Sequence, residues 1–140
     1  MISQMSSQLF LIRILSICSK MSDVVAANSS KCLQDQKMLL LQLRNNLTYD
    51  SEISTKLVKW NHRIDCCLWQ GVTCNGEGQV IGLDLSCEAF AGSINPLANL
   101  KYLSVIILDS NDLSAPIPDF FADFSNLTVL SLRYCNLIGE

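Results

Sequence analysis

Cysteine is the residue type with the most potential for chemistry in this chain, and its spacing is uneven. Seven of the 140 residues are cysteines. A high cysteine count in a short chain indicates an oxidising compartment and disulfide bonds. The adjacent residues Cys66 and Cys67 cannot bond each other without strain, so each is expected to bond in a different direction. We therefore expect the disulfides Cys32–Cys66 and Cys67–Cys74.

A zinc site is the alternative use of the same sulfur atoms. Its ligands would be Cys66, Cys67, Cys74 and His62, the only histidine in the chain. Structural zinc sites commonly take ligands from paired C-x2-C motifs, and that spacing is missing here. We favour the disulfides, expect His62 to be an ordinary surface residue, and expect no metal and no cofactor.

The sequence contains no recognisable catalytic constellation. With one histidine and no G-x-S-x-G motif, the sequence supports no nucleophile activated by an adjacent histidine. Gly76-Glu77-Gly78 is expected to form a turn and not a phosphate-binding loop, because no helix follows it. The sequence predicts a protein that is not an enzyme.

Composition and charge exclude two further classes of protein. Apolar residues make up 49% of the chain, charged residues make up 16%, and the formal net charge is −3. A disordered chain has fewer apolar residues and more charge. A nucleic-acid-binding domain carries a basic surface, whereas residues 65–140 hold 2 Lys and Arg against 9 Asp and Glu. We therefore expect no nucleic-acid partner.

The first residues are typical of a secretory leader. Residues 9–18 (LFLIRILSIC) form an apolar run that is too short to span a bilayer, and small residues follow near Ala26 and Ala27. We predict an atypical signal peptide over residues 1–27, interrupted by Arg13. In the secretory pathway, three N-x-S/T sequons are candidate glycosylation sites. They begin at Asn28, Asn46 and Asn126.

The segment between the cysteines predicts a helix and a hairpin. Apolar side chains recur at helical spacing at Leu39, Leu40, Leu43 and Leu47, which predicts a helix over about 35–46 with Asp35 at its N-cap. Two short strands are expected over 69–74 and 79–85, around the turn 75–78.

The second half of the chain repeats itself with a period of 23–24 residues. Six positions beginning at Leu100 recur 24 residues later: Leu100, Leu103, Ile106, Leu108, Asn111 and Leu113 become Phe124, Leu127, Leu130, Leu132, Cys135 and Leu137. A backward shift of 23 residues from the set Leu103, Ile106, Leu108, Asn111, Leu113 and Ala115 gives Val80, Leu83, Leu85, Glu88, Phe90 and Gly92. This frame is the signature of leucine-rich repeats. It predicts an α/β solenoid, a right-handed coil with a short parallel sheet.

Each repeat is expected to contain one strand, such as 105–109. Alternation along that strand points Ile106 and Leu108 inward. The amide of Asn111 is expected to turn inward and bond the backbone where the chain leaves the strand. Cys135 and Glu88 hold the equivalent place in the neighbouring repeats, and Glu88 is a poor choice there that suggests an irregular first turn.

Two of the cysteines lie in the repeats, and we expect them to stay unpaired. Cys87 and Cys135 are two repeats apart, and two strand spacings exceed the reach of a disulfide.

The outward-facing strand residues are the candidate binding groups. They are Asp84, Ser86, Ile107, Asp109, Ser131 and Arg133. A solvated acidic strand face without a ligand is the simpler explanation of the same residues. Tyr134, beside the strand end, is a further candidate for stacking on a ligand.

The cap sequence resembles a known family. The strings C-L-Q-D-Q-K-x-L-L-L-Q-L, W-N, D-C-C-x-W-x-G-V-T-C and G-x-V-I-G-L-D-L-S are similar to the N-terminal capping domain of plant leucine-rich-repeat receptor-like proteins. The segment 115–118 (A-P-I-P) is similar to the G-x-I-P element of their repeats, with Ala115 in place of glycine. The resemblance covers about residues 31–140.

The resemblance implies a domain order and a function. It implies a helical, disulfide-bonded cap over 28–78 and about two and a half repeats over 79–140. It implies the N-terminal fragment of an extracellular ectodomain in defence or developmental signalling. The concave face of such ectodomains binds protein or peptide ligands, and a co-receptor is a further expected partner. We expect a secreted or cell-surface location, with a membrane anchor only in the full-length protein. The alternative is a small secreted inhibitor of cell-wall-degrading enzymes, similar to polygalacturonase inhibitors.

Overall fold

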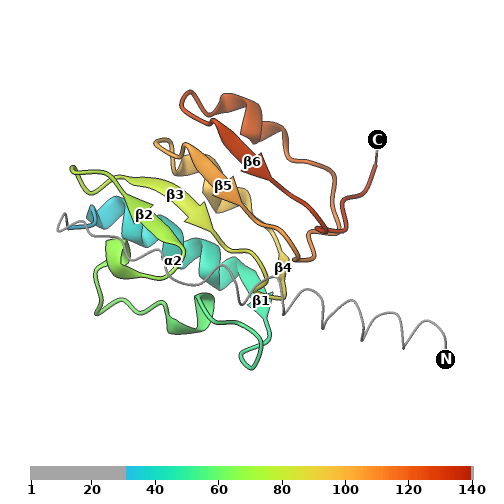
Figure 1. Ribbon diagram of the computed structural model, residues 1–140, viewed down its shortest axis with the longest axis horizontal. Coiled ribbons are helices and arrows are strands. Elements are labelled where there is room, and N and C mark those ends of the chain that lie inside the picture. Colours follow the sequence, from blue (N-terminus) through green and yellow to red (C-terminus); the bar gives the residue numbers. More distant parts are fainter. Residues whose placement is uncertain (1–30, 140) are drawn as a thin grey trace.

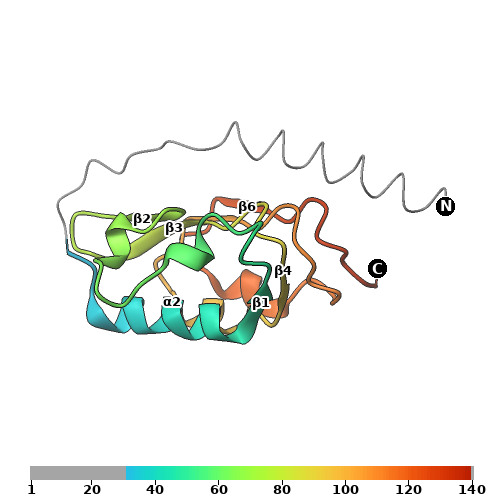
Figure 2. The same cartoon turned by 90° about the horizontal axis from the view of Figure 1, so that it is seen from below.

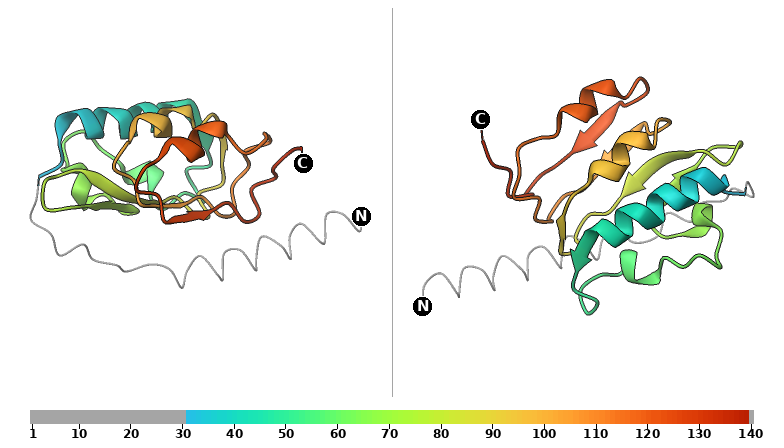
Figure 3. Two further views of the ribbon diagram at one scale, coloured as in Figure 1. Left: turned by 90° about the horizontal axis from the view of Figure 1, so that it is seen from above. Right: turned by 180° about the vertical axis from the view of Figure 1, so that it is seen from behind.

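The structure is a computed structural model that describes residues 31–139, and its main elements form two rows. One row is a four-stranded sheet with the spatial order β2 (Val72–Cys74), β3 (Val80–Asp84), β5 (Val105–Ile107) and β6 (Val129–Ser131). The other row is helical and contains α2 (Gln34–Asn46), η3 (Asn95–Asn99) and η4 (Asp119–Asp123). Figures 2 and 3 show that the helical row lies on one side of the sheet. Among residues 31–139, no helix lies on the opposite side of the sheet.

The helix α2 forms where its apolar spacing predicts it. Leu40 and Leu43 are completely buried. The predicted N-cap is wrong, because the helix begins one residue earlier and Leu33 occupies the cap position without a side-chain bond. Asp35 lies in the first turn instead, where its negative charge faces the positive end of the helix dipole. The buried Gln36 accepts a hydrogen bond from the backbone N–H of Val80 (3.2 Å), which joins the helix to the sheet.

The parallel strands align the repeats in register. Leu83, Ile106 and Leu130 are neighbours across β3, β5 and β6, as the period predicts. Ile106 and Leu108 are fully buried, which confirms the predicted inward side of the strand. The strand itself is shorter than predicted, because β5 ends at Ile107. The predicted hairpin is present, with β2 pairing antiparallel to β3.

A second, two-stranded sheet was not predicted from the sequence. β1 (Leu47–Tyr49) continues directly from α2 and pairs antiparallel with β4 (Phe90–Gly92). At Gly92 the backbone has a positive φ of 118°, and a Cβ atom there would lie 2.6 Å from the carbonyl oxygen of Asn46. Glycine therefore permits the close approach of the first repeat to the end of α2.

The turns after the strands also repeat. Cys87, Ser110 and Tyr134 occupy equivalent places, and their φ angles are 60°, 61° and 59°. A left-handed backbone is uncommon for residues other than glycine, so three equal values mark one turn geometry used three times.

The cap also contains two short helices and a pair of stacked indoles. The helices are η1 (Leu57–Lys59) and η2 (Cys66–Leu68). Trp60 and Trp69 are buried, and their rings stack with centroids 5.0 Å apart. Both residues belong to the hydrophobic core.

Both disulfides that the sequence favoured are present in the structure. They join Cys32 to Cys66 and Cys67 to Cys74, each with a Cα–Cα distance of 5.5 Å. The expectation that Cys87 stays unpaired is wrong, because Cys87 is disulfide-bonded. The strand-spacing argument excluded only Cys135 as its partner. Cys135 is free and buried.

Within residues 31–139, no helix has the length and apolar character needed to cross a membrane.

Candidate functional site

The six candidate residues form a grid across three strands; five of them are partly or fully exposed, whereas Ser86 is buried. The strand register places Asp84, Ile107 and Ser131 in one row across β3, β5 and β6. Two residues further along each chain, Ser86, Asp109 and Arg133 form a second row. We call these six residues the strand face. The structure thus brings together residues from three repeats.

The first carboxylate of the strand face has partners from the cap and from its own strand. Lys56 places its Nζ atom 3.3 Å from Oδ1 of Asp84. The same oxygen accepts hydrogen bonds from the hydroxyl of Ser86 (2.6 Å) and from its backbone N–H (3.0 Å). Asp84 is thus neutralised by a lysine that lies 28 residues earlier in the chain.

The second carboxylate has its partners in the next repeat. Asp109 accepts hydrogen bonds from the hydroxyl of Ser131 (2.6 Å) and from the backbone N–H of Arg133 (2.8 Å). The guanidinium of Arg133 lies 3.3 Å from Oδ2 of Asp109 and is 77% exposed. An exposed ion pair of this kind contributes little stability, so the cation is available to a partner at small cost.

The strand face is therefore mixed in charge. Two carboxylates are each matched by one cation, and the half-buried Ile107 lies between them. Hydroxyl, carboxylate and guanidinium groups around an apolar centre suit the recognition of a polypeptide.

Glu88 is the main residue whose role sequence reasoning missed. Its side chain is completely buried, and Oε1 accepts hydrogen bonds from the backbone N–H groups of Lys56 (2.9 Å) and Leu57 (2.7 Å) and from the Ser54 hydroxyl (2.7 Å). Oε2 accepts a bond from the N–H of Thr55 (3.2 Å). The signal was present in the sequence, since a carboxylate at a core position requires partners.

The Glu88 contacts position Lys56 for the strand face. Fixing the backbone of residues 54–57 directs the Lys56 side chain along the cap to Asp84. Gly71 leaves room for that side chain, because a Cβ atom at Gly71 would lie 3.2 Å from Cδ of Lys56 and 2.5 Å from the carbonyl oxygen of Asp84. The cap thus contributes a cation to the edge of the strand face.

The predicted role of Asn111 is confirmed. Its amide nitrogen donates to the carbonyl groups of Leu85 (2.8 Å) and Leu108 (2.9 Å), and its Oδ1 accepts from the N–H groups of Glu88 (3.2 Å) and Phe90 (3.0 Å). Cys135 fills the equivalent place with a single close bond, from Sγ to the carbonyl of Leu108 (3.0 Å). Burial raises the pKa of the Cys135 thiol above its usual value, which is typical of a structural cysteine.

The zinc alternative lacks its ligands in this structure. Cys66, Cys67 and Cys74 are all in disulfides, so none offers a thiolate. His62 is exposed, as expected, and its backbone carbonyl accepts a hydrogen bond from Lys37.

Two of the three sequons lie on the described surface. Asn46 is the last residue of α2 and Asn126 lies between η4 and β6, and both side chains are exposed. Asn28 and the predicted signal peptide lie outside the described residues. Glycosylation at these sites stays a prediction.

The chain is similar to known proteins in sequence and in structure. The family model described as "Leucine rich repeat N-terminal domain" matches residues 33–75. Receptor-like protein 50 of Arabidopsis thaliana is 36% identical over 119 residues, which cover 78% of this chain and 13% of that protein. Receptor-like protein 7 of the same species is 34% identical over 142 aligned residues, which cover 94% of this chain and 14% of that protein. The chain thus spans about one seventh of the length of these relatives.

Solved structures give the same fold. The BIR2 ectodomain of Arabidopsis thaliana aligns with a TM-score of 0.64 at 26% identity, covering 78% of this chain and 58% of that one. The leucine-rich-repeat ectodomain of the Arabidopsis receptor kinase HAESA, solved with a peptide hormone ligand, aligns with a TM-score of 0.63 at 23% identity. That alignment covers 75% of this chain and 17% of the HAESA chain.

Proposed function

This chain belongs with the N-terminal regions of plant leucine-rich-repeat receptor-like proteins, and on that premise we propose that it is part of a non-catalytic ectodomain that binds protein or peptide ligands. The similarity to receptor-like proteins over more than three quarters of the chain carries the proposal. The HAESA ectodomain, whose solved structure contains a peptide hormone, supports a polypeptide as the ligand class. Defence or developmental signalling is the proposed context.

We further propose that the repeats form one right-handed solenoid that continues beyond the described residues. Leu130 is 39% exposed, whereas its equivalents Leu83 and Ile106 are 1% and 0% exposed. Leu137 and Ile138 are also exposed, at 37% and 55%. A further coil stacked on β6 would bury this layer, as neighbouring repeats do in solenoid proteins. The much greater length of the relatives supports this continuation.

The proposed domain order is a signal peptide over 1–27, a cap over 28–78 and repeats over 79–140. An extracellular or cell-surface location follows from this order and from the disulfides, with Asn28, Asn46 and Asn126 as glycosylation sites. A co-receptor is a further proposed partner, supported by the solved complex of HAESA with a peptide hormone and the co-receptor SERK1. The inhibitor of cell-wall-degrading enzymes is not favoured, because the relatives named above are receptors.

The strand face is the proposed contact surface, and a displayed library of random peptides tests it. Peptides enriched on the wild-type protein are expected to bind at least about tenfold more weakly to the double variant Ile107→Asp, Arg133→Glu, because the variant charges the apolar centre and reverses the exposed cation. The matched control is Asp119→Lys, Asp123→Lys, which changes charge on η4, in the helical row. Equal binding to both variants would show that the strand face is not the contact surface.

A further inference from the structure

The cap contains a pairing choice that distance does not decide. The sulfur atoms of Cys32, Cys66 and Cys67 and a carboxylate oxygen of Asp65 all lie within 4.8 Å of one another. Cys67 is therefore close enough to Cys32 to compete with Cys66 for it. Cys32 could bond either Cys66 or Cys67 by distance alone, so a factor other than proximity must select Cys66.

Loop entropy does not decide the choice either. The observed disulfides span 34 and 7 residues. Because the two cysteines are adjacent, the swapped pairs Cys32–Cys67 and Cys66–Cys74 would span one residue more in each case, 35 and 8. The cost of closing a loop changes only with the logarithm of its length, so the two pairings differ very little in this respect.

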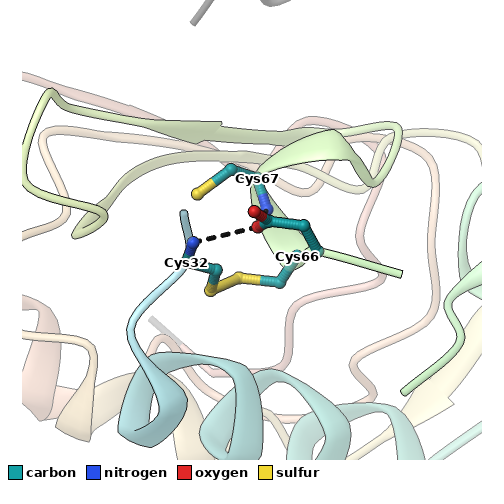
Figure 4. Close-up of side chains that lie close together, drawn as sticks. Cys32, Cys66 and Cys67 are labelled. Carbon is teal, nitrogen blue, oxygen red and sulfur yellow. Dashed lines mark hydrogen bonds between the residues drawn. A yellow bond between two sulfur atoms is a disulfide. The ribbon is translucent and has the colours of Figure 1, made fainter. Parts of the chain in front are cut away.

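The directions of the side chains do differ. Figure 4 shows the Cys66 side chain running to Cys32, while the Cys67 side chain leaves the backbone on the other side. These directions follow from the tight turn of η2, in which the N–H of Leu68 donates to the carbonyl of Asp65 (2.9 Å) and the N–H of Trp69 donates to that of Cys66 (3.1 Å). The turn therefore determines which sulfur faces Cys32.

Asp65 connects this turn to the segment that carries Cys32. Its Oδ1 atom accepts a hydrogen bond from the backbone N–H of Cys67 (2.9 Å), which caps η2. The same oxygen accepts a second bond from the backbone N–H of Cys32 (2.9 Å), 33 residues away in the chain. Bonds to an ionised acceptor are among the stronger hydrogen bonds of proteins.

We propose that Asp65 is a positioning residue that selects the disulfide pairing of the cap. With both bonds in place, Cys32 lies beside Cys66, and Cys67 is turned to Cys74. Each disulfide then forms as two thiols transfer two electrons and two protons to an oxidant such as glutathione disulfide, which becomes two glutathione molecules. Without the carboxylate, the turn and the Cys32 segment are no longer tied, and both sulfurs compete for Cys32.

The test is oxidative refolding of the full chain in a glutathione buffer, with the pairings quantified by mass spectrometry of proteolytic peptides. The two pairings can be told apart only if the backbone is cleaved between Cys66 and Cys67. Sequential fragmentation of the linked peptides in the mass spectrometer provides this cleavage. The wild type and Asp65→Asn, which keeps an oxygen acceptor, are expected to give the native pairs. In Asp65→Ala the ratio of Cys32–Cys66 to Cys32–Cys67 is expected to fall about tenfold.

A matched control keeps the result specific. Asp50 also accepts a bond from a backbone N–H through Oδ1, that of Glu52 at 2.8 Å, on an exposed loop. Asp50→Ala is expected to leave the pairing ratio unchanged. An unchanged ratio in Asp65→Ala, or an equal fall in Asp50→Ala, would overturn the proposal.

A second variant measures the competition between the two sulfur atoms for Cys32 directly. Cys74→Ser removes the native partner of Cys67, so Cys66 and Cys67 compete for Cys32 in one chain. Cys66 is expected to dominate when Asp65 is present, and the two products are expected to approach equal amounts in the Asp65→Ala background. Equal selectivity in both backgrounds would refute the proposal. No ligand enters either experiment, so its outcome is independent of the proposed function.

Discussion

Replacing Glu88 tests how the first repeat is joined to the cap. The carboxylate is completely buried and accepts three hydrogen bonds at 2.7–2.9 Å on one oxygen. In Glu88→Ala the N–H groups of Lys56 and Leu57 lose their acceptor inside the protein. A buried polar group without a partner costs about 1–3 kcal/mol, and a lost bond to a charged group is worth about 1.5–3 kcal/mol.

The magnitude expected for Glu88→Ala follows from these contacts. The two N–H groups left without an acceptor lower the free energy of unfolding, and some rehydration near the exposed Thr55 reduces this cost. The expected loss is about 3–5 kcal/mol. Glu88→Gln keeps an oxygen for Lys56 and Leu57 but turns an NH₂ group toward the N–H of Thr55. We expect this variant to lose about 1–2 kcal/mol. The order of stability is therefore wild type, Gln variant, Ala variant.

The assay is urea unfolding of the oxidised protein, followed by the fluorescence of the buried residues Trp60 and Trp69. Glu52→Gln, the same chemical change on an exposed residue, is the control and is expected to stay within about 0.5 kcal/mol of the wild type. A loss below about 1 kcal/mol in Glu88→Ala would refute the reasoning, because it would mean that the loop 54–57 is held by other contacts.

Two further predictions concern the equivalent position of the next repeats. Asn111→Ala is expected to lower the free energy of unfolding by about 2–4 kcal/mol, since its amide serves several buried backbone groups at once; a loss under about 1 kcal/mol in the same urea assay would contradict this. Cys135 is expected to react with iodoacetamide at least about tenfold more slowly in the folded protein than in urea at pH 8, because burial raises the pKa of its thiol and the thiolate is the reactive form. Quantifying the labelled Cys135 peptide by mass spectrometry decides the second prediction, and equal rates in the two solvents would argue against it.

The elements with a period were predictable from the sequence. The recurrence at Leu83, Ile106 and Leu130 predicts neighbouring parallel strands, because only one side of each strand faces the core. The helix α2 was equally accessible from the spacing of Leu40 and Leu43. The pairing of β1 with β4 was not, because three-residue strands in a long-range antiparallel pair leave no alternation to detect. The bonding of Cys87 was missed for a similar reason, since sequence spacing excluded one partner and identified no other.

In the candidate site, too, the residues that belong to the repeats were predictable from the sequence and the cap residues were not. The rows of the strand face follow directly from the repeat register, so the alignment of the six residues was predictable from the sequence, and their role in binding stays a prediction. Lys56 was not found, because it reaches Asp84 from a loop that belongs to no repeat. The same loop is the partner of Glu88, 31–34 residues earlier in the chain. Periodicity identifies the members of a repeat but not the cap residues that meet the first one.

The glutamate at position 88 of the first repeat is explained by its neighbour, which is the cap and not another repeat. The amide of Asn111 bonds backward, to the backbone at Leu85, Glu88 and Phe90 in the preceding repeat. The first repeat has no preceding repeat, so an asparagine at position 88 would have no such backbone to meet. A glutamate is one methylene longer and accepts only, and the cap offers it a run of N–H and hydroxyl donors. The departure from the repeat frame at Glu88 is therefore the device that attaches the repeats to the cap, and the same device positions the cation of Lys56 at the strand face.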